Sequence, residues 1–223
     1  CTLSSRSCAI KFGSGTTEDM RDHLYSNIAI RNSNRGLGIQ HRGPGDIENV
    51  LFSDITVETR LFTGNWWGQA EPIHVSSLPR TEGGELGTVR NVRFRNVVAR
   101  GEGGVVLWGT GGNVRNVTLD GVELRLRGGD LADRRGGNLD LRPTGVRPSI
   151  EAAEVPGVYA RGVADLDCHR VAVAWADDRP PEYYTNAVAC EDCEGVEIDG
   201  FRGRGGTGLA LALRDCAGAT VRD

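Results

Sequence analysis

The sequence contains little of what helical, membrane-spanning or nucleic-acid-binding proteins need. Aromatic residues make up 6% of the 223 residues, and there is a single methionine. No apolar run is long enough for a transmembrane helix, and no stretch with helical periodicity exceeds about two turns. The formal charge of −4 provides no basic footprint for a nucleic acid. We therefore predict no membrane span, no nucleic-acid partner and little helix.

Motifs of several enzyme classes are also missing. No Ser-His-Asp arrangement, phosphate-binding loop or cluster of metal ligands is recognisable. Cys190 and Cys193 have C-x-x-C spacing, but a zinc or redox site would need a second pair or a thioredoxin-like context. We therefore predict no metal and no cofactor. Cys168, Cys193 and Cys216 each precede a short repeat by two residues, so we expect them to stack as small buried residues on one corner.

What the sequence does contain is a recurring six-residue pattern. A polar or small residue is followed by alternating apolar positions and then by Asn, Asp or Gly, as in residues 49–54 (NVLFSD) and 91–96 (NVRFRN). The copies start at residues 27, 49, 91, 116, 170, 195 and 218, which are separated by 22, 42, 25, 54, 25 and 23 residues. Such short alternation predicts strands with one buried face. The period predicts stacked units that share a core.

Two solenoids have a period in this range. A leucine-rich repeat requires a Leu-x-x-Leu-x-Leu frame and a stricter length, and this chain has neither. A right-handed parallel β-helix needs short strands, turns rich in Gly and Asn, and a corner that tolerates insertions. The 32 glycines suit such corners, and so do Asn and Asp, because they accept left-handed backbone. Stacked Asn side chains can also bond between coils.

We therefore predict an all-β, right-handed parallel β-helix. A single domain is expected over residues 1–223, with insertions near residues 59–88 and 125–162. The chain opens on Cys1 without a methionine and closes on Asp223, the last residue of a repeat. We expect a fragment truncated at both ends, with a complete small domain as the alternative.

Three motifs carry a resemblance to a known family. They are residues 9–14 (AIKFGS), 34–40 (NRGLGIQ) and 66–73 (WWGQAEPI). Together they resemble glycoside hydrolase family 28, the polygalacturonase and rhamnogalacturonase family. The resemblance implies a right-handed parallel β-helix, inverting hydrolysis of pectic polysaccharides, and a secreted or periplasmic location.

The chain departs from that family at identifiable positions. Residues 7–14 fall where the family has Gly-His-Gly-x-Ser-x-Gly-Ser, and Cys8 stands at its His. Arg35 matches the arginine of Asp-Arg-Gly, whereas Gly38 and Gln40 replace the Arg and Lys that hold a substrate carboxylate. These losses count against plain galacturonan as the substrate. The resemblance places the catalytic aspartates upstream of Cys1, so we expect the fragment alone to be inactive.

Six residues are candidates for substrate binding: Lys11, Arg35, Arg42, Trp66, Trp67 and Glu71. Adjacent Trp66 and Trp67 cannot both enter a solenoid core, and an exposed indole stacks well on a sugar ring. Lys11, Arg35 and Arg42 lie on or next to second strands of successive coils, where they would form a cationic strip for uronate carboxylates. A plain surface charge is the alternative for each cation, and for each Trp the alternative is a ring that covers the open side of the solenoid.

The acidic candidates are fewer. Inverting hydrolysis needs two carboxyl groups about 6.5–9.5 Å apart. Glu71, in the Trp-Trp insertion, and Glu102 are the most suggestive acids, with a solvated turn carboxylate as the alternative for each. We interpret His41 and His74 as incidental polar residues.

Three functions remain open. The first is part of a pectin-degrading glycoside hydrolase, monomeric, with an acidic polysaccharide or oligosaccharide as substrate. The second is a non-catalytic glycan-binding β-helix. The third, a pectate-lyase-type enzyme, usually holds calcium in an acidic cluster, and no such cluster is visible in the sequence.

Overall fold

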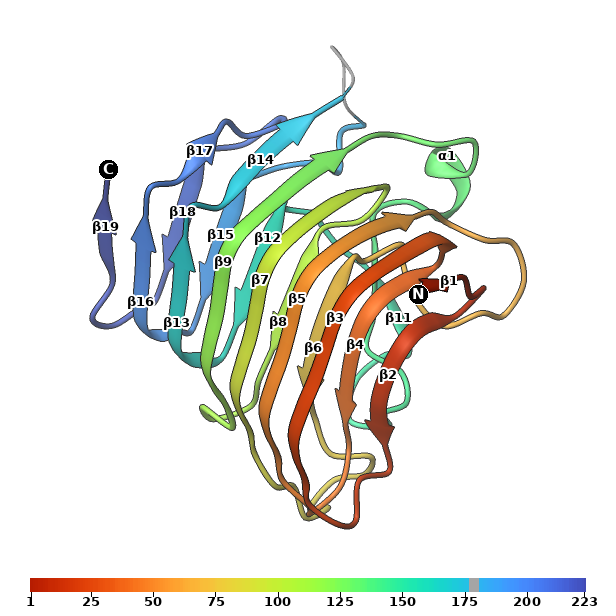
Figure 1. Cartoon of the computed structure of the whole chain (residues 1–223), viewed down its shortest axis with the longest axis vertical. Coiled ribbons are helices and arrows are strands. Elements are labelled where there is room, and N and C mark those ends of the chain that lie inside the picture. Colours follow the sequence, from red (N-terminus) through yellow and green to blue (C-terminus); the bar gives the residue numbers. More distant parts are fainter. Residues whose placement is uncertain (177–180) are drawn as a thin grey trace.

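The computed structural model describes residues 1–176 and 181–223, and almost all of its regular structure is β-strand. Two parallel sheets face each other (Figure 1). The larger sheet runs in the order β1 (Thr2–Leu3), β3 (Met20–Ser33), β5 (Ile47–Thr59), β7 (Val89–Gly101), β9 (Val114–Leu126), β13 (Val163–His169), β16 (Glu194–Asp199) and β19 (Thr220–Arg222). Beside this path lie β14 (Ala172–Trp175) and β17 (Arg202–Gly203).

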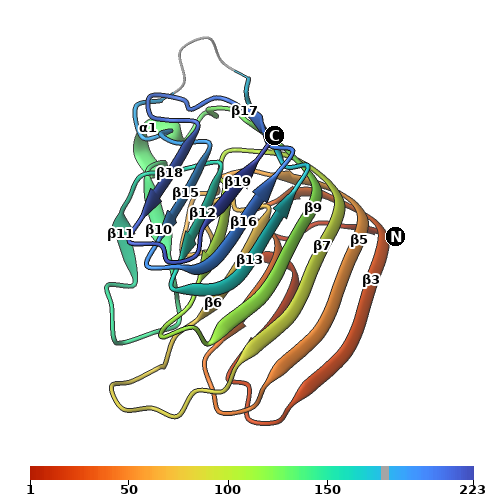
Figure 2. The ribbon, with the colours of Figure 1, turned by 90° about the vertical axis from the view of Figure 1, so that its left-hand side faces the viewer.

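The smaller sheet contains seven strands. Its order is β2 (Cys8–Ser14), β4 (Arg35–His41), β6 (Ile73–Ser77), β8 (Val105–Trp108), β12 (Val158–Arg161), β15 (Val188–Glu191) and β18 (Leu211–Arg214). The chain alternates between the two sheets, and each strand pairs in parallel with its counterpart one turn later (Figure 2). The prediction of an all-β chain built from stacked parallel strands is confirmed, and the arrangement is consistent with a solenoid.

Polar residues in left-handed backbone make the corners within the long strands. Asn49, Asn91 and Asn116 have φ of 57°, 56° and 49° and lie at equivalent positions of β5, β7 and β9. The Nδ2 of Asn91 donates to Asn49 Oδ1 at 3.0 Å, and Asn116 donates to Asn91 at 2.6 Å. The predicted asparagine ladder is confirmed. It satisfies the corner amides while it holds successive coils in register.

The pairing corrects the start of the first repeat. His23 lies opposite Val50, so Asp22, not residue 27, corresponds to Asn49. The frame was misread because each long strand has two polar, left-handed corners five residues apart, such as Asn49 and Asp54. Alternating apolar residues follow both corners, and the sequence pattern cannot distinguish them.

The fifth repeat was misread in the same way. Leu166 lies opposite Val117, so the repeat starts at Asp165 and not at Arg170. Both residues have positive φ, of 52° and 51°, and therefore look alike as corners.

The misplaced start of the fifth repeat also makes the predicted corner position of Cys168 wrong. Cys168 lies opposite Ile198 within the core and not on the corner that Cys193 and Cys216 share. The prediction of buried thiols is confirmed for Cys168 and Cys193, whereas Cys216 is only partly buried; all six cysteines are free.

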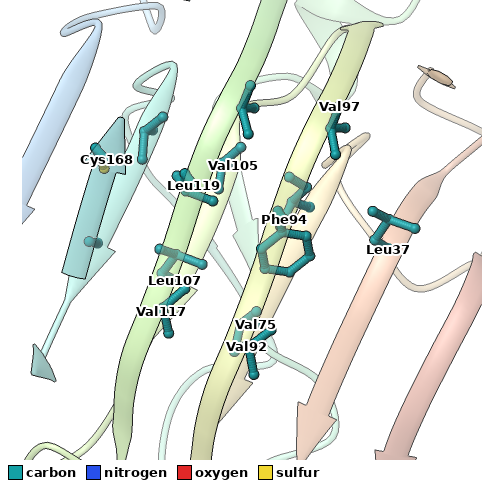
Figure 3. Close-up of a cluster of buried hydrophobic side chains, with 14 of the residues drawn as sticks. Leu37, Val75, Val92, Phe94, Val97, Val105, Leu107, Val117, Leu119 and Cys168 are labelled. Atoms are coloured by element: carbon teal, nitrogen blue, oxygen red, sulfur yellow. The ribbon is translucent and has the colours of Figure 1, made fainter. Parts of the chain in front are cut away.

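The core fills the space between the sheets with columns of like side chains. Phe52 and Phe94 stack with ring centroids 5.1 Å apart, and Tyr25 stacks on Phe52 at 5.3 Å. Aliphatic residues from the facing sheet, such as Val75 and Leu107, close the other side (Figure 3). Because every coil presents its apolar residues at the same register, the core continues from coil to coil.

The two expected insertions contain strands of the smaller sheet. Residues 59–88 include β6, and residues 125–162 include β12. The second insertion also holds α1 (Ala132–Arg135) and an antiparallel hairpin of β10 (Asn138–Asp140) and β11 (Ile150–Ala152). The hairpin packs through Leu139 and Leu141 against Leu78, Val106 and Trp108 on the outer face of the smaller sheet. The true insertions are therefore the loops on either side of these strands.

Candidate functional site

The tryptophan loop is fixed to the smaller sheet by polar side chains. Asn34 Nδ2 donates to the carbonyls of Trp67 and Gly68 at 3.2 Å each, and its Oδ1 accepts from Ala70 N at 3.1 Å. Asp140, from the hairpin, accepts from Gly68 N at 2.6 Å. Because two separate elements hold this loop, the tryptophans stand in a defined position.

Arg35 and Glu71 form a buried ion pair at the base of this loop. Arg35 Nη2 lies 2.7 Å from Glu71 Oε1, and Nε lies 3.1 Å from Oε2, a bidentate geometry. Arg35 also donates to the carbonyl of Asp140 at 3.0 Å. Burial would raise the pKa of Glu71, but the Arg35 charge outweighs it and holds the pKa well below its usual range. Glu71 therefore carries a charge that Arg35 already neutralises.

His74 completes this buried cluster. Its Nδ1 lies 3.3 Å from Glu71 Oε1, and its Nε2 lies 2.9 Å from Ser76 Oγ. Burial, together with the charge of Arg35, lowers the pKa of His74 to about 4. The ring is thus neutral near pH 7 and bridges Glu71 and Ser76.

Arg42 anchors the hairpin to the sheet. Its Nε donates to the carbonyl of Pro143 at 2.8 Å, and Nη2 donates to that of Leu141 at 2.5 Å. On the sheet side, Nη1 donates to the carbonyl of Ser76 at 2.8 Å. One guanidinium thus uses its fork of donors to join two segments that lie about a hundred residues apart in sequence.

These contacts correct half of the predicted binding set. The relative exposures of Arg35, Arg42 and Glu71 are 0%, 3% and 2%, so none of the three forms part of a surface strip. The sequence correctly placed Arg35 on a strand and Arg42 next to it, but alternation along a strand cannot show that a later loop or hairpin will cover its outer face.

Of the other three predicted residues, Lys11 and Trp67 come together at the surface, whereas the ring of Trp66 lies beside Arg6 instead. Lys11 Nζ lies over the ring of Trp67, 5.0 Å from its centroid, and the guanidinium of Arg142 lies 5.9 Å from the same ring. Trp66 is 42% exposed and has Arg6 5.8 Å from its ring centroid. We call Lys11, Trp67, Arg80 and Arg142 the cationic-aromatic cluster.

Two cations of this cluster have no carboxylate partner among residues 1–176 and 181–223. Lys11 makes only the ring contact, and Arg80 donates to Ser14 Oγ at 3.3 Å. Partial burial and the neighbouring arginines lower the pKa of Lys11. A cavity of about 290 Å³ opens beside Arg80 and the ring of Trp67, and it is also lined by Arg142 and residues 143, 144 and 149. An anion placed here would relieve the repulsion between these cations.

Cys8 and Gly38 depart from the family pattern together. A Cβ at Gly38 would lie 2.5 Å from Cys8 Sγ, so a side chain at position 38 does not fit while the thiol stays there. Burial raises the pKa of the Cys8 thiol to about 11, which keeps it neutral and unreactive. None of the cations of the cluster stands at position 38 or 40, where glycoside hydrolase family 28 has its Arg and Lys.

The cluster holds no exposed pair of carboxylates. Glu71 is buried beneath it, and Glu102 is occupied elsewhere, where its Oε1 accepts from Leu61 N at 3.2 Å. Among the residues that the structure describes, no group of His, Cys, Asp and Glu could hold a metal ion. The arrangement can therefore bind an anionic ring by charge and stacking, and it offers no acid–base pair of its own.

Arg80 and Arg142 were not among the sequence candidates. Arg142 is 75 residues from Trp67 in sequence and reaches it only because Arg42 and Asp140 fix the hairpin. Its Nη2 also pairs with Asp140 Oδ2 at 2.8 Å. No local pattern connects these positions, so the sequence held no usable signal.

Comparison with known proteins gives a weak likeness. No family model matches the chain, and no solved structure matches it. A stretch of 95 residues is 33% identical to calcium-transporting ATPase type 2C member 2 from Homo sapiens, covering 42% of this chain and 10% of that protein. The chain spans about a tenth of that relative, so the likeness carries no activity over to it. None of the helices in the described part of the chain has the length and apolar character to cross a bilayer.

Proposed function

We propose that the cationic-aromatic cluster binds an acidic glycan, as the substrate-binding flank of a glycoside hydrolase that acts on pectic polysaccharides by inversion. The observation that carries the proposal is the placement of Lys11 and Arg80, two cations without carboxylate partners in the described chain, beside the ring of Trp67. A uronate ring has both features that this surface can recognise, a carboxylate and an apolar C–H face.

The fold supports the same proposal. We propose that the stacked parallel strands form a right-handed β-helix, because parallel strands connected through a second layer are almost always right-handed. In such a solenoid the outer face of one sheet is an extended surface suited to a polymer. The motifs at residues 9–14 and 34–40, which resemble glycoside hydrolase family 28, form β2 and β4 of the sheet that carries the cluster. A secreted or periplasmic location follows only from that resemblance.

The catalytic step is assigned to residues outside this sequence. The resemblance to glycoside hydrolase family 28 implies that its two catalytic aspartates lie upstream of Cys1, and the cluster itself has no exposed carboxylate pair. The same observation favours a second candidate, a non-catalytic module that binds acidic glycans. The two candidates share the binding site and differ only in the upstream carboxylates.

An assay of the full-length protein on galacturonan and rhamnogalacturonan separates the two candidates. Release of new reducing ends, with inverted anomeric configuration by NMR, would support the hydrolase. Binding of either polymer without release would support the module, and neither binding nor release would contradict both. The 223-residue chain alone is expected to bind but not to hydrolyse.

A further inference from the structure

A second and larger hollow lies on the outer face of the smaller sheet, on the other side of the hairpin. Its volume is about 750 Å³, and its floor is formed by β12, β15 and β18. The hairpin forms the wall of the hollow through Glu151, Ala152 and Ala153. The connection between β10 and β11 also lines the cavity at Trp67, so the hairpin divides two sites.

The floor of this groove combines one aromatic ring with small side chains. Tyr159, Ala189 and Ala212 occupy one register column on β12, β15 and β18. The ring of Tyr159 meets Trp108 edge-on at 6.0 Å, and its hydroxyl donates to Glu191 Oε2 at 3.0 Å. The ring is thus held at both ends, while the neighbouring alanines leave room beside it.

The arginines around the groove are paired with carboxylates, unlike Lys11 and Arg80 near Trp67. Arg147 lies 2.7 Å from Glu151, and Arg214 lies 3.3 Å from Glu191. Arg161 lies 3.6 Å from the same Glu191 and 3.3 Å from Asp192. An anionic ligand would find no unpartnered cation among these groups, whereas hydroxyl groups can donate to the carboxylates and accept from the guanidinium groups.

We propose that this groove binds a neutral oligosaccharide. Its volume falls within the range of small-ligand sites, and the fixed Tyr159 ring offers a stacking face for an uncharged sugar. This inference rests on the proposed function in one respect only, namely that the ligand is a glycan. Lys11 and Tyr159 share one register column four strands apart, so they are separated by roughly 19 Å and do not contact one sugar unit. The chain thus accepts acidic sugars on one side of the hairpin and neutral sugars on the other.

Isothermal titration of the 223-residue chain with two matched ligands tests this division. Galactotetraose and tetragalacturonate share ring configuration and length and differ in charge. The variant Ala212→Trp fills the groove from its open face without removing a buried contact, and Lys11→Ala alters only the other site. We expect Ala212→Trp to weaken galactotetraose binding about tenfold or more and to leave tetragalacturonate unchanged, with the reverse pattern for Lys11→Ala. Tyr159→Phe keeps the ring and should retain at least part of the galactotetraose affinity.

The outcomes separate this inference from the proposed function. If galactotetraose does not bind, or if Ala212→Trp leaves its affinity unchanged, the neutral-sugar groove is wrong even when tetragalacturonate binds at Lys11. If tetragalacturonate fails to bind while galactotetraose binds and its affinity falls in Ala212→Trp, the proposed function is contradicted and the neutral-sugar groove is supported. Thermal unfolding of both variants shows whether a lost signal reflects misfolding, and Ala212→Arg then serves as a second block of the groove.

Discussion

Two charged clusters lie in the same coils of the smaller sheet and use similar residues in opposite ways. In the buried cluster, Arg35 is bonded to Glu71 and to the hairpin backbone, so its charge is paired within the protein. In the exposed cluster, Lys11 and Arg80 have no carboxylate partner in the described chain. The buried charges therefore stabilise the structure of the site, whereas the exposed charges are available to bind a ligand. The predictions below test this division in order of expected effect.

Removing the carboxylate of the buried pair should have the largest effect. Glu71→Ala leaves Arg35 as an unpaired charge at 0% exposure, so we expect a loss of about 3–5 kcal/mol in the free energy of unfolding. Urea denaturation measures it, and Glu58→Ala, at an exposed acid, is the matched control. Equal stability of the two variants would show that the buried pair does not hold the loop.

The buried histidine should make stability depend on pH. The pKa of His74 is lowered from 6.5 to about 4, so between these values the unfolded chain binds a proton that the folded chain does not. Stability should therefore be full above about pH 6.5 and fall by about 3 kcal/mol toward pH 4. The low pKa of Glu71 adds a loss at lower pH still. Unfolding curves of wild type and His74→Gln between pH 4 and 7 test this, and an unchanged slope in the variant would count against it.

Loss of the hairpin anchor should affect both stability and binding. Arg42→Met removes the donors to Leu141 and Pro143 and leaves their carbonyls unsatisfied, which should cost about 2–3 kcal/mol. It should also weaken tetragalacturonate binding, because Arg142 would no longer be held beside Trp67. Arg115→Met, at an exposed arginine, is the control for each measurement. If Arg42→Met is destabilised but binds tetragalacturonate normally, the hairpin anchor is not needed to hold Arg142 in the binding site.

The exposed cluster should show the opposite pattern. Lys11→Ala should change the free energy of unfolding by no more than about 0.5 kcal/mol, because its ammonium has no ion pair in the described chain. Tetragalacturonate affinity should nevertheless fall about tenfold and become less sensitive to salt. A large loss of stability with unchanged affinity would assign Lys11 to the scaffold.

The pattern of stacked strands was readable from the sequence because the corners between strand segments have strict backbone requirements. Positive φ at Asn49, Asn91 and Asn116 selects Asn, Asp or Gly, and the alternating core positions follow directly. What failed was the choice between two equivalent corners, which displaced the first and fifth repeats by five residues. Only pairing between coils, as between His23 and Val50, distinguishes them.

Site residues could be predicted from the sequence only when their exposure depends on their own loop and not on a distant segment. Trp66 and Trp67 were found because two adjacent indoles cannot both enter a narrow core. Arg35 and Arg42 were misplaced because the hairpin that covers them comes about a hundred residues later. Arg142 was missed for the same reason, since its position depends on these long-range contacts.

The four tryptophans allow the most direct test of the acidic-glycan site. In a titration with tetragalacturonate followed by indole N–H resonances, the account predicts shifts for Trp67 and the adjacent Trp66. Trp108, on the other side of the hairpin, and Trp175, on the larger sheet, should remain unchanged. Shifts confined to Trp108 or Trp175, or no shift at any concentration up to the solubility limit, would contradict it.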